Sequence, residues 1–175
     1  IKLWRRPEPT KKLDLAGLEG PPRSIAVSTD GALVAVGEET GKIKIYDAKS
    51  GQIAKTLQGH TAPVTGVAFS ADGSKILSGA QDKSCRLWSV AESKEIGIIE
   101  TPAPVNAVAF VAEEKQVATG GADNKLVTWN LPAPKVEGQE APKPIKEMAH
   151  GGAVTSLLAL NKSAQIVSGS ADGQL

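Results

Sequence analysis

Cysteine, histidine and aromatic residues are scarce in this sequence. Its 175 residues include one cysteine, two histidines and 3% aromatics. The single cysteine, Cys85, excludes an internal disulfide and leaves the redox compartment open. Its neighbours alternate as in a strand, so we expect a small buried hydrophobe and not a nucleophile. His60 and His150 are 90 residues apart and form no pair at a usual metal spacing. We therefore expect no metal.

A phosphate-binding motif and long runs of one residue class are also lacking. The glycine pairs Gly120-Gly121 and Gly151-Gly152 are not followed by the Lys-Ser/Thr of a phosphate loop, so no cofactor is expected. Lys and Arg number 20 against 19 Asp and Glu, and no basic cluster exceeds two residues, so nucleic acid is not an expected partner. No apolar run approaches the roughly 20 residues that span a bilayer, and no signal peptide is visible. These features predict a soluble protein that does not bind membranes, with the cytoplasm slightly favoured.

What the chain does contain is an internal repeat. Large aromatic residues recur at intervals of 42, 42 and 41, at Trp4, Tyr46, Trp88 and Trp129. Glycines that end short apolar runs recur at intervals of 42, 41 and 49, at Gly37, Gly79, Gly120 and Gly169. Each unit reads as four short strands, which in the second unit span 64–70, 75–79, 84–90 and 95–100. Asp30-Gly31 and Asp72-Gly73 stand where tight hairpin turns are needed.

Four strands in about 40 to 45 residues form one blade of a β-propeller, and the details resemble the WD-repeat family. The family's Gly-His pair is present as Gly59-His60 and, altered, as Ala149-His150. Its Trp-Asp pair is imitated at three sites, by Tyr46-Asp47, Trp88-Ser89 and Trp129-Asn130. We therefore predict an all-β propeller of four-stranded antiparallel WD-type blades, with three complete blades and one split between the two termini.

The predicted blades divide one half-ring domain, 1–175, into segments. The second half of blade 4 spans 1–22, and its first half spans 152–175. Blades 1, 2 and 3 span 23–60, 61–102 and 103–151. A proline-rich loop at 132–144 interrupts blade 3 and accounts for the 49-residue interval.

The family resemblance implies a structural tetrad of His, Ser or Thr, Asp and Trp in each blade. The second unit has all four members, which are His60, Ser78, Asp82 and Trp88. The fourth unit has His150, Ser168 and Asp172, and only Trp4, from the other end of the chain, would complete its set. The third unit keeps Thr119, Asp123 and Trp129, with Thr101 at the histidine position, and the first has Val36 and Thr40 in place of Ser and Asp. A recurring Ser, His and Asp also invites a hydrolase interpretation. That alternative is remote, because the set recurs with the repeat and no Gly-x-Ser-x-Gly pattern accompanies either serine. We expect no enzyme.

The two ends of the chain are complementary halves of a repeat. Joining them would complete one blade, at an interface formed by Ile1, Lys2, Leu3, Trp4, Ile166, Val167, Ser168 and Gly169. The leading hypothesis is a homodimer in which two chains exchange strands and close one eight-bladed ring. The joined ends are one residue too long for a regular blade. Counted across the junction of the two termini, Trp4 is the seventh residue after Asp172, whereas Trp88 is the sixth residue after Asp82. The alternatives are an interaction domain from a longer WD-repeat protein and an engineered or trimmed half-propeller.

Binding of other proteins is predicted only weakly. The family resemblance implies docking on the loops that enter the first strand and on those between the second and third strands. These loops include Thr61, Pro63, Gln81, Glu39, Pro104 and Ala122. The rim carries no Trp, Tyr or Arg, the usual hot-spot residues, so no partner can be named from it.

Overall fold

The computed structural model describes residues 15–111, 114–133, 142–159 and 165–173. These residues form strands and no helix. Blade 1 contains β1 (Pro22–Val27), β2 (Leu33–Glu38), β3 (Ile43–Asp47) and β4 (Ile53–Leu57). Blade 2 contains β5 (Val64–Phe69), β6 (Lys75–Ala80), β7 (Ser84–Ser89) and β8 (Lys94–Glu100). Blade 3 contains β9 (Val105–Val111), β10 (Gln116–Gly121), β11 (Lys125–Asn130) and β12 (Lys146–Ala149), and the described part of blade 4 contains β13 (Val154–Ala159) and β14 (Ile166–Ser170).

The predicted fold class is confirmed. Each of the three full blades is an antiparallel sheet in which the four strands follow one another in chain order. In blade 2 every strand begins and ends within one residue of the expected range. The predicted second half of blade 4 falls largely on residues 1–14, which lie outside the described residues.

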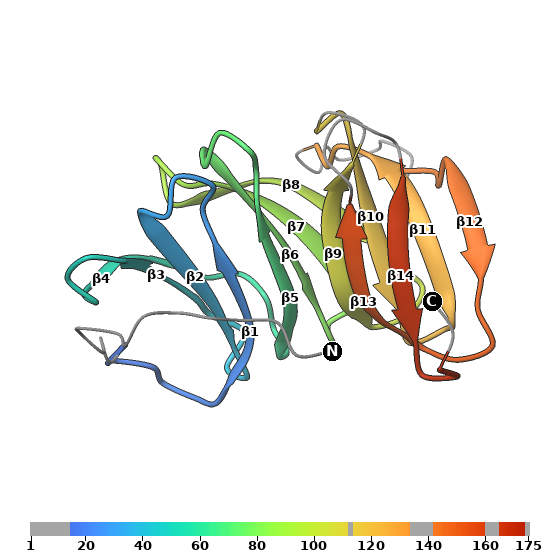
Figure 1. The fold of residues 1–175 in the computed structure, drawn as a ribbon, viewed down its shortest axis with the longest axis horizontal. Coiled ribbons are helices and arrows are strands. Elements are labelled where there is room, and N and C mark those ends of the chain that lie inside the picture. Colours follow the sequence, from blue (N-terminus) through green and yellow to red (C-terminus); the bar gives the residue numbers. More distant parts are fainter. Residues whose placement is uncertain (1–14, 112–113, 134–141, 160–164, 174–175) are drawn as a thin grey trace, which may run out of the picture.

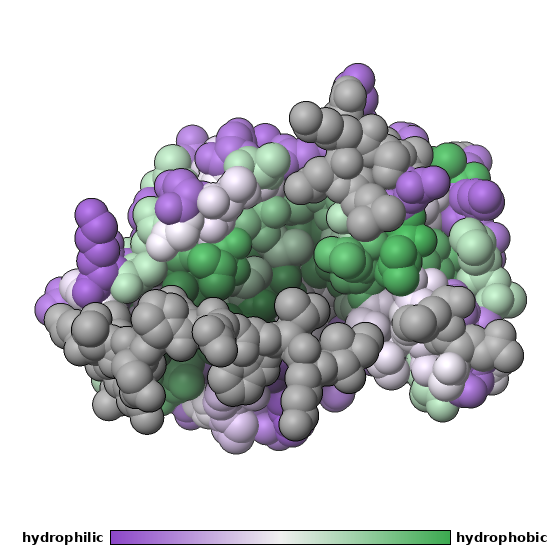
Figure 2. Space-filling model, viewed as in Figure 1, coloured by the Kyte–Doolittle hydropathy of each residue, from purple (hydrophilic) through white to green (hydrophobic). Residues whose placement is uncertain are grey.

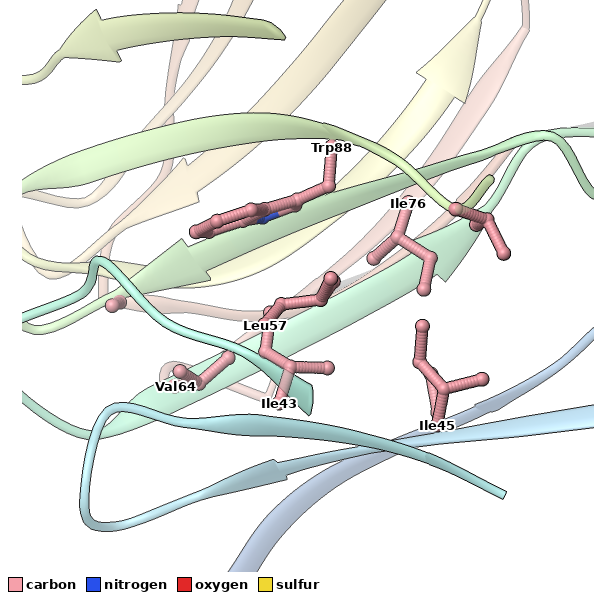
Figure 3. Packing of buried hydrophobic residues seen from close by; sticks show 9 residues of the cluster. Ile43, Ile45, Leu57, Val64, Ile76 and Trp88 are labelled. Atoms are coloured by element: carbon pink, nitrogen blue, oxygen red, sulfur yellow. The ribbon is translucent and has the colours of Figure 1, made fainter. Parts of the chain in front are cut away.

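The blades stand in a row, with their first strands β1, β5, β9 and β13 side by side in that order (Figure 1). The core lies between blades, because successive side chains of a strand point to opposite faces of its sheet. On β6, for example, Ile76 packs toward blade 1 and Leu77 toward blade 3. Figure 3 shows Trp88 and Ile76 of blade 2 on one side of this core and Ile43 and Ile45 of blade 1 on the other.

A glycine on each second strand allows the next blade to come close. A Cβ added to Gly37 would lie 2.7 Å from Cγ1 of Val64, and one on Gly120 would lie 2.5 Å from Cγ1 of Val154. Gly79 is in the same relation to Val105, which fills the space above its Cα. Each valine is the first residue of the next blade's first strand. The repeated glycines are therefore contact points between neighbouring blades.

The predicted hairpin turns also form. Gly31 and Gly73 both have φ of 70°, which glycine adopts without steric cost. In the first of these turns Asp30 accepts hydrogen bonds from the Ser28 hydroxyl at 2.6 Å and from the Ala32 N–H at 2.9 Å. The local sequence therefore closes the turn without help from the rest of the fold.

Candidate functional site

The polar network of blade 2 joins two strands, the turn between them and the loop that precedes the blade. His60 lies in the loop before β5, Ser78 on β6, Asp82 in the β6–β7 turn and Trp88 on β7. The Ser78 hydroxyl accepts a hydrogen bond from Trp88 Nε1 at 2.8 Å and lies 2.7 Å from His60 Nε2. His60 Nδ1 lies 2.8 Å from Asp82 Oδ2. The structure thus brings together all four residues that the sequence placed in one tetrad.

The Asp82 carboxylate is held in its charged form. Burial acts to raise the pKa of Asp82, but hydrogen bonds from His60 and Ser84 outweigh burial and hold that pKa well below its usual range. The backbone N–H of Thr61 also donates to Asp82, at 3.1 Å. Asp82 therefore ties the β6–β7 turn to the loop before β5, through the His60 imidazole and the Thr61 backbone.

This arrangement is suited to bracing the blade. The Ser78 oxygen is fully buried between the imidazole and the indole of Trp88. A nucleophile must reach a substrate, whereas this hydroxyl is enclosed by its own partners. The one cysteine, Cys85, is also buried, and burial raises the pKa of its thiol. In the described residues no group of three His, Cys, Asp or Glu side chains could hold a metal ion.

The corresponding positions of blades 3 and 4 carry parts of the same network. Trp129 Nε1 donates to the Thr119 hydroxyl at 2.9 Å, as Trp88 does to Ser78. Asp123 accepts from the Lys125 N–H at 3.3 Å. In blade 4, Ser168 lies 3.1 Å from His150 Nε2. The tryptophan predicted for this blade, Trp4, lies outside the described residues.

Blade 1 replaces the network with one centred on a buried glutamate. Val36 and Thr40 stand at the serine and aspartate positions, as the sequence indicates. The Glu38 carboxylate accepts from the Thr40 hydroxyl at 2.9 Å and from the Glu19 N–H at 3.1 Å. The sequence indicated Glu38 only as part of the loops of the possible binding rim, whereas its side chain is buried. The sign of its burial in the sequence was its position, because Glu38 stands on the second strand where blade 2 has the buried Ala80.

A histidine at position 101 should complete the tetrad of blade 3. A cavity of about 10 Å³, about the size of one water, lies among Thr101, Thr119, Asp123 and Trp129. An imidazole there can bond to Thr119 and Asp123, so we expect Thr101→His to raise the free energy of unfolding by about 1 kcal/mol in urea denaturation. Thr101→Val is the control, because it cannot make either bond. Equal stability of the two variants would contradict the prediction.

The predicted rim is assembled by one repeated backbone hydrogen bond. In each blade the loop after the second strand donates to the loop before the first, and the donor–acceptor pairs are Glu39–Pro21, Gln81–Pro63, Ala122–Pro104 and Ala171–Ala153, at 2.8 to 3.0 Å. Thr61, Gln81, Glu39 and Ala122 are exposed on these loops, and Pro63 and Pro104 are partly buried. The rim residues thus lie at equivalent places in successive blades.

A surface groove opens beside this rim. It has a volume of about 300 Å³ and is lined by Thr61, Asp82, Lys83, Ser84, Arg86, Ile98, Glu100 and Thr101. Only Thr61 belonged to the predicted rim. Lys83 lies in the same β6–β7 turn as Gln81 but was not among the predicted rim residues, and Arg86 was missed because it lies on β7 and not on the loops that the resemblance indicated.

Four-stranded blades side by side, one of which is braced by a buried network of His, Ser, Asp and Trp, define a β-propeller scaffold. The model of the family described as "WD domain, G-beta repeat" matches residues 51–89 and 93–130. Each match runs from the outer strand of one blade through the third strand of the next. These two segments are therefore WD repeats, and the blades have the fold of a WD-repeat β-propeller.

Similar proteins share only part of their length with this chain. Periodic tryptophan protein 2 homolog of Schizosaccharomyces pombe is 35% identical over 43% of the chain and 9% of that protein. Human angio-associated migratory cell protein is 40% identical over 41% and 17%, and transcription factor unc-37 of Caenorhabditis elegans is 34% identical over 55% and 16%.

One solved structure matches nearly throughout. The crystal structure of the computationally designed Ika4 protein aligns with a TM-score of 0.74 and 27% identity, over 94% of each chain. The fold is thus shared along the chain. Within the described residues there is no helix with the length and apolar character needed to cross a membrane.

Proposed function

We propose that this chain is a non-catalytic WD-repeat scaffold, and that two copies close one eight-bladed ring by exchanging strands across their termini. The observation that carries the proposal is apolar surface on the outward faces of the two end blades. On β1, Ile25 is 66% exposed and Val27 is 58% exposed. On blade 4, Leu158 is 61% exposed and Val167 is 42% exposed.

The same positions are covered wherever a neighbouring blade is present. Val67 and Phe69 of blade 2 correspond to Ile25 and Val27, and they pack against the core between blades 1 and 2. Leu77 corresponds to Val167 and is buried between blades 2 and 3. Figure 2 shows apolar surface across the middle of the view, on the side where the first strands of the blades lie. Each end face therefore has the composition of a surface that packs against another blade.

The inner half of blade 4 supports strand exchange. Among the described strands β14 pairs only with β13, whereas every other second strand pairs on both sides. An unpaired edge is a template for another strand. Ile1-Lys2-Leu3-Trp4 has the pattern of a third strand, and its tryptophan would meet Ser168 as Trp88 meets Ser78. Residues 1–14 lie outside the described residues, so this pairing is a proposal.

Two copies suit the geometry better than one. The two outward faces lie at opposite ends of the row of first strands (Figure 1). Four units from each of two chains make eight, within the range of about 4 to 8 blades in propellers. A two-fold axis makes both junctions identical, so a single pair of complementary faces closes the ring.

Light scattering tests the assembly. We expect a particle of twice 18.1 kDa at micromolar concentration. Trp4→Ala should weaken association by at least 100-fold, because losing a buried aromatic costs about 3 to 5 kcal/mol. Met148→Ala is the control, since Met148 is exposed on the outer strand of blade 3. A monodisperse 18.1 kDa species would contradict ring closure.

A second candidate function is protein binding as part of a longer WD-repeat protein. The rim loops and the groove beside Thr61 favour it, because the rim loops recur at the same place in each blade and the groove opens beside one of them. In that case further blades of the same polypeptide would cover the end faces. An intact mass above 18.1 kDa for the natural protein would support this alternative.

A further inference from the structure

We infer that, at the junction between two copies, Pro22 of one copy packs against Gly169 of the other. This inference rests on the proposed ring. It specifies which residues would fit together if a second copy covers the outward faces of blades 1 and 4. The pattern for it is present in all three contacts between neighbouring blades inside the chain.

Each internal contact places a valine over a bare glycine. Val64, Val105 and Val154 lie above Gly37, Gly79 and Gly120. The three valines are at most 1% exposed, and the three glycines are buried. There is no room for a Cβ on any of these glycines, because one placed there would lie within 3.0 Å of the valine side chain. The fit therefore depends on glycine in the second strand and on an apolar side chain in the next blade.

A side-chain hydrogen bond accompanies each fit. Ser24 donates to the carbonyl of Val64 and Asn106 to that of Val154, both at 3.0 Å. Thr65 donates to the carbonyl of Val105. One blade thus binds both the side chain and the backbone of the valine presented by the next.

The strand register identifies the residues of blades 1 and 4 that stand at the valine and glycine positions of this contact but have no partner blade within the chain. Val64 pairs with the residue after Gly79, across a bulge, and Pro22 pairs with the residue after Gly37 in the same way. Pro22 is therefore the counterpart of the valines. It can occupy this place because it is the first residue of β1.

On blade 4, Gly169 is the counterpart of the three buried glycines. It pairs with Ser156, as Gly79 pairs with Gly66. Thr155 stands at the position of Thr65, and both hydroxyls donate to the carbonyl of the glycine opposite, at 3.2 Å. Thr155 would donate to the Pro22 carbonyl as Thr65 donates to that of Val105.

Pro22 and Gly169 are less buried than the residues of the three internal contacts. Pro22 is exposed and Gly169 is partly exposed, whereas all the internal valines and glycines are buried. Pro22 and Gly169 belong to blades at opposite ends of the row, so one copy presents both halves without joining them (Figure 1). A second copy supplies the matching half at each end, which is why we assign the occupant as another copy of this chain.

Gly169→Val is the test, with the full chain and light scattering over a range of concentrations. We expect this variant to remain folded by circular dichroism and to dimerise at least about 30-fold more weakly, because the added side chain clashes at both junctions of a two-fold dimer. Ala91→Val is the matched control, because Ala91 is exposed in a turn of blade 2. Adding Pro22→Gly to the Gly169→Val chain should restore part of the affinity, since the smaller residue makes room.

The possible outcomes separate the inference from the proposed ring. A wild-type dimer that Gly169→Val leaves intact would overturn the Pro22–Gly169 contact and leave ring closure standing. A monomeric wild type would overturn both. If Gly169→Val does not fold, Thr155→Val decides, because it removes only the hydroxyl; an unchanged dimer affinity for that variant would count against the contact.

Discussion

Ser78→Ala is expected to lower the free energy of unfolding by about 2 to 4 kcal/mol. The hydroxyl accepts from Trp88 Nε1 and lies 2.7 Å from His60 Nε2. Its removal leaves two buried polar groups, Trp88 Nε1 and His60 Nε2, without this hydrogen-bond partner, and each such group costs about 1 to 3 kcal/mol. Urea denaturation followed by tryptophan fluorescence measures the change. The size of the effect follows from the position of Ser78, which is the only residue of the network that contacts both rings.

Two variants serve as controls for this effect. Ser78→Thr should retain most of the stability, because Thr119 accepts the same indole hydrogen bond at 2.9 Å in blade 3. Trp88→Phe removes the indole N–H, so the cost of Ser78→Ala should be smaller in that background. Strict additivity of the two changes would show that the hydrogen bond contributes nothing. Ser78→Ala with wild-type stability and loss of a hydrolytic activity would instead favour the hydrolase alternative.

Features set by local sequence could be predicted closely. Asp30-Gly31 closes a turn whose φ and hydrogen bonds arise within a few residues, so the sequence contains all the information needed. The tetrad of blade 2 was expected from the family resemblance, and its members meet because they lie on strands, a turn and a loop that follow one another in chain order. Ser78 lies opposite Arg86 in the register of β6 and β7, so Trp88, two residues further along β7, is its diagonal neighbour on the same face of the sheet.

Features that depend on contacts between blades could not be predicted in the same way. The periodic glycines were evident, but the sequence did not show that a valine of the next blade lies over each one. That contact joins residues about 30 positions apart and depends on how two sheets pack. The burial of Glu38 was not predicted, for a related reason. Its burial depends on Glu19 and Thr40 meeting its carboxylate, and glutamate on a strand ordinarily indicates exposure.

The contact between blades 2 and 3 should tolerate no side chain on the glycine. Gly79→Val is expected to cost about 3 kcal/mol or more, because even a Cβ there would lie 2.7 Å from Cγ1 of Val108 and closer still to Val105. For a chain of this length that loss lowers Tm by roughly 6 to 12 °C, which differential scanning calorimetry can measure. Ala91→Val adds similar volume at an exposed turn and should leave Tm nearly unchanged.

A double-mutant cycle distinguishes this clash from a general intolerance of β6. Gly79→Ala adds only the Cβ, and Val105→Ala removes the methyl groups that it meets. If the two residues clash directly, the double variant will be more stable than the sum of the single changes implies, by about 1 kcal/mol or more. Additive effects would mean that Gly79 is required by its own strand. Because Gly37 and Gly120 meet valines in the same way, a coupling at Gly79 would make the glycine–valine contact a general rule for how neighbouring blades of this chain pack.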